Sequence, residues 1–135
     1  MIKIVVAQYS KYLVIMLGVM LVGFGLVTMI HPEIMNRYGL NLGDAHAKST
    51  VMAVIGGSEI GLGFFVLFGH KIGVKISARI AMLLLIFMGI LVARLLSVVL
   101  YYPELPNVFF REVIAEISIS VLLLIGLLTE RRQTF

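Results

Sequence analysis

The chain has 135 residues, of which 61% are apolar and 13% charged, and its mean hydropathy is +1.10. A soluble domain usually has about 25% charged and about 45–50% apolar residues, so this composition excludes an ordinary soluble protein. The lack of cysteine excludes a disulfide framework, a thiolate metal site and a thiol nucleophile. The formal charge is +4, but no basic patch alternates with polar sequence, so no nucleic-acid partner is expected.

Four long apolar runs predict four transmembrane helices, at residues 12–30, 48–69, 78–101 and 107–128. Each run has roughly the 20 residues that a helix needs to cross a hydrocarbon core of about 30 Å. Transmembrane strands are excluded, because the runs are long and show no period-two alternation. Short loops make consecutive helices antiparallel neighbours. The sequence therefore predicts an all-α antiparallel four-helix bundle that forms a single integral membrane domain over residues 1–135.

Several residues mark the ends of these helices. Pro32 is expected to stop the first helix, and Gly39 to close a short turn that follows it. Asp44, Ser77 and Asn107 are the predicted N-caps of the second, third and fourth helices, because short polar side chains accept hydrogen bonds from exposed helix N–H groups.

The distribution of basic residues predicts the orientation. Seven lie in the N-terminal segment, the middle loop and the C-terminal tail: Lys3, Lys11, Lys71, Lys75, Arg79, Arg131 and Arg132. Three lie on the opposite side, namely Arg37, Lys48 and Arg111. Because Lys and Arg are retained on the cytoplasmic side of a membrane, both termini and the middle loop are expected in the cytoplasm.

Small residues recur at four-residue spacing in the second run, at Ala53, Gly57 and Gly61. Such a pattern lets two helices approach closely in lipid. Two interpretations remain open: packing within the bundle, or a homo-oligomer seam through Gly57 and Gly61.

Ionisable residues inside the predicted helices indicate where a functional site is expected. They are costly in hydrocarbon, so they turn inward and find partners. Glu59, Arg94 and Glu116 fall at comparable depths and predict one cluster in the outer half of the bundle. Glu112 shares a helix face with Glu116, and Ser97 and Tyr101 share one with Arg94. The candidate site residues are Glu59, Arg94, Ser97, Tyr101, Glu112 and Glu116.

The charges of this predicted cluster do not balance. Three carboxylates face Arg94, and Arg111 is a second cation only if it leaves the headgroup region. Glu112 alternatively pairs with Arg111 or Lys48 at the interface. If Arg111 stays outside, either one carboxylate is protonated or the cationic group of a ligand completes the site.

No metal or cofactor is expected. His31 and His46 lie in the first loop, and His70 lies on the other side of the membrane. Ser58 and Ser97 have no histidine base near them in the sequence, so no catalytic residue is assigned.

The chain resembles a family of small uncharacterised bacterial membrane proteins, which are four-helix domains of unknown function loosely similar to DoxX-type proteins. The similar segments are residues 56–63 (GGSEIGLG), residues 94–97 (RLLS), residues 37–39 (RYG) with Asn41, and a glutamate early in the last helix. The resemblance implies a four-helix fold, a bacterial inner-membrane location and, through DoxX-type proteins, a role near quinones or respiratory chemistry.

Three functions remain open. The first, which we favour, is binding or transport of a small amphipathic or cationic molecule at the carboxylate and arginine cluster, with membrane lipids as neighbours. The second is a structural or accessory subunit of a larger membrane complex, in which the cluster only holds the helices together. The third is a membrane enzyme, such as an isomerase of lipid-like substrates, that uses one glutamate as acid and another as base.

Overall fold

The structure, a computed structural model, describes the backbone of residues 2–102 and 107–131, and their side chains except those of residues 2–7, 108 and 131. Over these residues the chain is all-α. The elements are α1 (Ile2–Ile30), η1 (Pro32–Tyr38), α2 (Ala45–Val51), η2 (Met52–Gly57), α3 (Ser58–Phe68), η3 (Gly69–Ile72), α4 (Ile76–Tyr101) and α5 (Asn107–Arg131). Two of them, η1 and η3, are 3₁₀-helical, and η2 is a π-helical stretch that joins α2 to α3.

Within residues 2–102 and 107–131, four segments are long and apolar enough to cross a membrane: Gln8–Ile30, Ala45–Ile72, Ile76–Tyr101 and Phe109–Glu130. This confirms the prediction of four helices that are long and apolar enough to span a membrane. The first helix starts at Ile2, ten residues before the predicted start at Tyr12, because residues 2–11 continue the helix of the apolar run.

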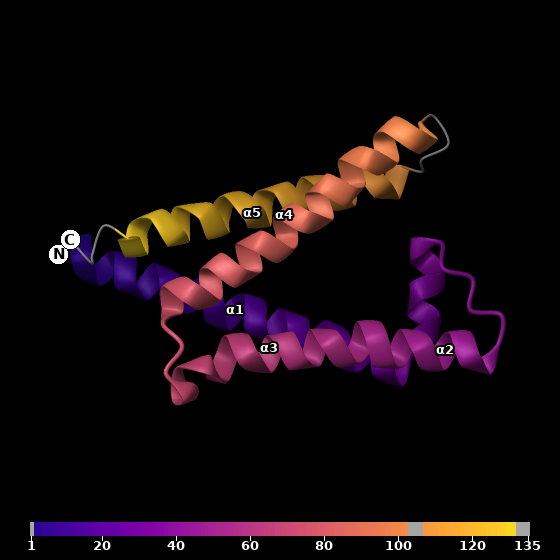
Figure 1. Cartoon of the computed structure of the whole chain (residues 1–135), viewed down its shortest axis with the longest axis horizontal. Helices are drawn as coiled ribbons and strands as arrows, with labels where there is room; N and C mark the ends of the chain where they lie inside the picture. The colour runs from indigo at the N-terminus through magenta and orange to yellow at the C-terminus, as the bar shows by residue number, and fades with distance from the viewer. Residues whose placement is uncertain (1, 103–106, 132–135) are drawn as a thin grey trace. The chain divides into compact units, whose positions relative to one another are not determined.

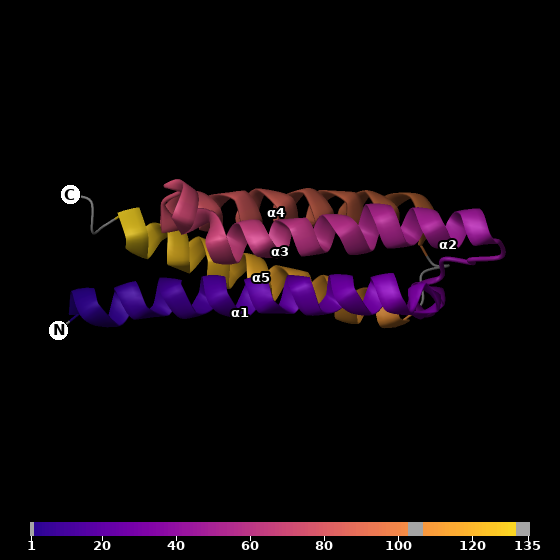
Figure 2. The same cartoon turned by 90° about the horizontal axis from the view of Figure 1, so that it is seen from below.

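The chain divides into two compact units. The hairpin unit is Val14–Val74, and the terminal unit combines Met1–Leu13 with Lys75–Phe135. Figures 1 and 2 show the helices that belong to each, with α1 contributing its first turns to the terminal unit and the rest to the hairpin unit.

In the hairpin unit, α1 packs against η2 and α3 through four glycines. A Cβ atom built on Gly25 would lie 2.7 Å from the carbonyl oxygen of Gly56, and one built on Gly63 would lie 2.9 Å from that of Gly18. The two helices are therefore antiparallel, with their backbones in direct contact. We call these residues (Gly18, Gly25, Gly56 and Gly63) the glycine seam.

The predicted packing of Ala53, Gly57 and Gly61 within the bundle differs from this arrangement. A Cβ atom on Gly61 would meet no atom within 4 Å, and one on Gly57 would meet only the carbonyl oxygen of Met52, at 3.8 Å. The reason is helical geometry: Gly57 lies one residue after Gly56 and Gly61 lies two residues before Gly63, so both project from other sides of the helix than the glycines that contact α1. The oligomer interpretation of the Gly57 and Gly61 face stays a prediction.

Most of the predicted helix ends agree with the structure. Pro32 opens η1 directly after α1, and Gly39 closes η1 with φ = 80°. The Asp44 carboxylate accepts a hydrogen bond from the Ala47 N–H at 2.6 Å, so Asp44 is the N-cap of α2.

Two predicted caps are wrong. Lys75 is the N-cap of α4, because its carbonyl oxygen already accepts hydrogen bonds from the backbone N–H groups of Ala78 and Arg79, and Ser77 therefore lies inside the helix. Asn107 is the first residue of α5 rather than the residue before it.

In the terminal unit, α4 and α5 run side by side in opposite directions (Figures 1 and 2). Ile80 and Leu83 of α4 and Leu123 of α5 are fully buried. The Tyr9 hydroxyl of α1 donates a hydrogen bond to the Leu122 carbonyl oxygen at 3.1 Å, which ties the first turns of α1 to α5.

Large apolar side chains face outward along the helices. Leu85 and Val99 of α4, for example, are 73% and 80% exposed. Such surfaces are costly in water and favourable in hydrocarbon, so they are consistent with lipid contact.

Candidate functional site

Arg94 joins α4 to α5 through two ion pairs. Its Nη2 atom lies 2.8 Å from Glu112 Oε2 and 3.1 Å from Glu116 Oε1. Its Nε atom donates a second hydrogen bond to Glu116 Oε1 at 3.3 Å. The four-residue spacing of the two glutamates places both on the face of α5 that meets α4. We call Arg94, Glu112 and Glu116 the charged cluster.

An aromatic ring supports the arginine. The Arg94 guanidinium carbon lies 5.1 Å from the centre of the Phe109 ring, within the range of a cation–π contact. Phe109 is itself buried on α5, one turn before Glu112. The guanidinium is therefore held by contacts from three residues of α5.

The charged cluster is largely shielded and has a net charge of −1 when all three groups are ionised. The side chains of Arg94, Glu112 and Glu116 are 30%, 21% and 14% exposed. The second oxygen of Glu116, Oε2, is inaccessible and has no hydrogen-bond partner in the described part of the chain. Glu112 pairs with Arg94, and Arg111 is exposed. The charged cluster therefore contains one carboxylate oxygen, Glu116 Oε2, that accepts no hydrogen bond from the described residues.

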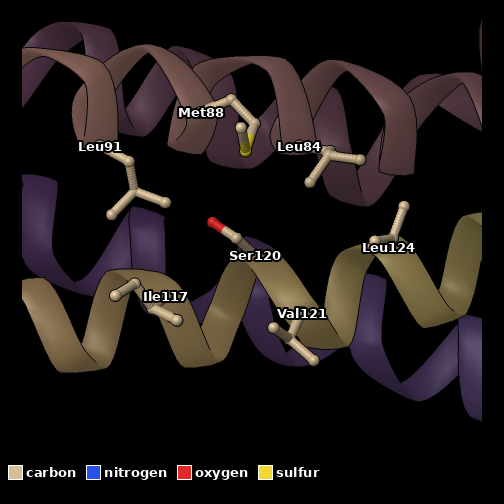
Figure 3. A pocket seen from close by; sticks show the side chains of 7 residues that line it. All are labelled: Leu84, Met88, Leu91, Ile117, Ser120, Val121 and Leu124. Carbon is tan, nitrogen blue, oxygen red and sulfur yellow. The ribbon is translucent and has the colours of Figure 1, made fainter.

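A pocket of about 400 Å³ lies between the same two helices (Figure 3). Its walls are Leu84, Met88 and Leu91 from α4 and Ile117, Ser120, Val121 and Leu124 from α5. Ser120 is the polar member of this set, and Figure 3 shows its hydroxyl pointing toward α4. Its hydroxyl donates to the Glu116 carbonyl oxygen at 2.8 Å, so the proton of this group is already used.

The pocket and the charged cluster follow each other along both helices. Leu91 lies three residues before Arg94 on α4, and Ser120 lies four residues after Glu116 on α5. These spacings are about one helical turn. The terminal unit therefore places an apolar pocket next to a group of charges with negative excess.

The remaining predicted site residues are placed differently. The Ser97 hydroxyl donates to the Ala93 carbonyl oxygen of its own helix at 2.9 Å, and Tyr101 is 57% exposed at the end of α4. Neither takes part in the ion pairs of Arg94.

Glu59 lies on α3, in the hairpin unit, directly after the π-helical stretch η2. Lys48, eleven residues before Glu59, pairs with Glu33 at 2.8 Å. The shared cluster of Glu59 with Arg94 and Glu116 stays a prediction.

The pocket was missed from the sequence. Leu84, Met88 and Leu91 look like ordinary membrane residues, although their spacing continues to Arg94 and marks one face of α4. Within residues 2–102 and 107–131, no three His, Asp or Glu side chains are grouped closely enough to hold a metal ion.

Comparison with known proteins gives a family but no activity. No curated protein matches the chain, and no solved structure matches it. A family model described as a domain of unknown function matches residues 9–127, which is most of the chain and includes both the pocket and the charged cluster. The chain therefore belongs to the family described as Domain of unknown function (DUF4345).

Proposed function

We propose that this protein binds or transports a small amphipathic or cationic molecule in the membrane, at the pocket and charged cluster of α4 and α5. The observation that carries the proposal is the adjacency of an apolar pocket of about 400 Å³ to a cluster in which two carboxylates face one arginine. Sites for small molecules are usually of this kind, mostly apolar with a few polar groups that orient the ligand.

The chemistry of the apolar pocket and of the charged cluster suggests how a ligand is held. The apolar part of the ligand lies against leucines, Met88 and Val121, where Ser120 offers no spare proton. The head group lies beside the charged cluster, on the side of Glu116. Because the cluster has a negative excess, a positively charged or hydrogen-bond-donating head group suits it better than an anionic one.

We further propose the bacterial inner membrane as the location, with an antiparallel bundle and both termini in the cytoplasm. The seven Lys and Arg residues on one side against three on the other support this orientation. The similarity to DoxX-type proteins stays a prediction.

The proposal is tested by binding of a long-chain primary alkyl amine, with the alkyl carboxylate of equal length for comparison. Native mass spectrometry of gently extracted protein detects both the added amine and any molecule that co-purifies. Leu91→Trp fills the pocket, and Leu95→Trp is the matched control, because Leu95 is 65% exposed on the same helix.

We expect the amine to bind to the wild type and to Leu95→Trp, and to bind at least tenfold more weakly to Leu91→Trp and Glu116→Gln. Equal binding of amine by all four proteins would refute the pocket as the site. Preference for the carboxylate would refute the role of the negative excess.

A structural role is the second candidate, and the double ion pair of Arg94 favours it. One guanidinium that holds two carboxylates from a neighbouring helix is also what a bundle lock requires. If no small molecule binds and the protein co-purifies with a defined membrane complex, the accessory-subunit function replaces the binding function.

A further inference from the structure

The carboxyl group of Glu59 belongs neither to the pocket nor to the charged cluster. It lies within the membrane-spanning segment Ala45–Ile72. Its Oε2 atom is inaccessible and has no hydrogen-bond partner in the described part of the chain. Glu112 and Glu116, in contrast, each have an oxygen paired with Arg94.

Glu59 takes part in none of the ion pairs found among the side chains that the structure describes. Glu59 lies three residues after Gly56 and four before Gly63, so it flanks the glycine seam where α3 contacts α1. From Val14 to Ile30, α1 has no ionisable residue, and neither does η2. Lys48 of α2, the nearest lysine along this span, is engaged with Glu33.

The neighbouring hydroxyl is also unavailable to Glu59. Ser58 donates to the carbonyl oxygens of Val54 and Ile55, both of which belong to the π-helical stretch η2. A hydroxyl has one proton to donate, so Ser58 has none left for a carboxylate. Stretches of π-helix in α-helices are frequent at functional sites.

We propose that Glu59 is a proton-binding site, held as a neutral carboxylic acid in the second membrane-spanning segment, while the carboxylates paired with Arg94 are ionised. A carboxylate without a partner is strongly disfavoured in hydrocarbon, and uptake of a proton removes its charge. A paired carboxylate keeps its charge because the guanidinium compensates it. This assignment does not depend on the ligand-binding proposal, because it concerns a different unit of the chain.

A hydrophobic carbodiimide distinguishes the two kinds of glutamate. The reagent, dicyclohexylcarbodiimide, takes the proton of a neutral carboxyl group, the carboxyl oxygen adds to its central carbon, and rearrangement leaves a stable N-acylurea with no group lost. Peptide mass spectrometry of the treated protein then locates the adduct. We expect modification of Glu59, falling as the pH rises, and at least tenfold less modification of Glu116.

Infrared spectroscopy tests the same assignment without depending on access by the reagent. The carbonyl stretch of a protonated acid is separate from the carboxylate bands, and we expect Glu59→Gln to remove it while Glu116→Gln leaves it unchanged. The amide is also a close copy of a neutral acid, so Glu59→Gln should retain the wild-type unfolding temperature. An unchanged protonated-acid band in Glu59→Gln, or adducts on Glu116 with none on Glu59, would overturn the proposal.

Discussion

Replacing Arg94 with alanine removes the cation that contacts both Glu112 and Glu116. Breaking a fully buried ion pair by removing one partner costs about 3–5 kcal/mol, because the other charge is left uncompensated. Fully exposed pairs contribute about 0–1 kcal/mol. The three side chains are 14–30% exposed, so they lie between these limits.

We therefore expect Arg94→Ala to lower the free energy of unfolding by about 2–3 kcal/mol. Part of this loss is the contact of the guanidinium with the Phe109 ring, which is worth about 0.5–1 kcal/mol.

The assay is denaturant unfolding of the purified protein in mixed micelles, followed by circular dichroism. Arg111→Ala is the matched control, because Arg111 is an exposed arginine on α5, and we expect its stability to match the wild type. Adding Glu112→Gln and Glu116→Gln to Arg94→Ala should recover part of the loss. Wild-type stability in Arg94→Ala would show that the charged cluster does not hold α4 to α5.

Three further predictions concern the rest of the chain. Gly63→Ala should lower the free energy of unfolding by about 1–3 kcal/mol, because its Cβ would lie 2.9 Å from the Gly18 carbonyl oxygen; Gly61→Ala, with open space, should not. The hydrogen bond from Lys48 holds the pKa of Glu33 below its usual range. The pair therefore stabilises the fold at pH values above the usual pKa range of glutamate, and this contribution is lost as the pH falls through the lowered pKa. Lys48→Met should raise the Glu33 pKa, measured by carboxyl NMR, toward its usual range. Tyr9→Phe should cost about 0.5–1.5 kcal/mol in chemical unfolding, through loss of its hydrogen bond to α5.

The membrane-spanning helices were predictable because their signals are local. A run of about 20 apolar residues decides that a segment is a membrane-spanning helix, and this needs no knowledge of its neighbours. The ends at Pro32, Gly39 and Asp44 were also predictable, because each acts on the backbone within a few residues. Ser77 was misassigned because Lys75, two residues earlier, already accepts the first helical hydrogen bonds.

The candidate site was predictable only in part. The cost of charge in lipid indicated that Arg94 finds carboxylates, and the spacing of Glu112 and Glu116 indicated that they share a face. The sequence left several partners open for Glu112, and the structure pairs it with Arg94. The apolar pocket has no sequence signature, because leucines that line a cavity look the same as leucines that face lipid.

The sequence by itself determined that the chain has four helices long and apolar enough to span a membrane, and which ionisable residues lie inside those helices. The tertiary structure decided which glycines touch and which charges pair. Which residues of two helices touch depends on the rotation of each helix about its axis and on the point where the helices cross. Both of these are determined by contacts between residues far apart in the chain. Gly56 and Gly63 therefore contact α1, while Gly57 and Gly61 lie on other sides of the helix.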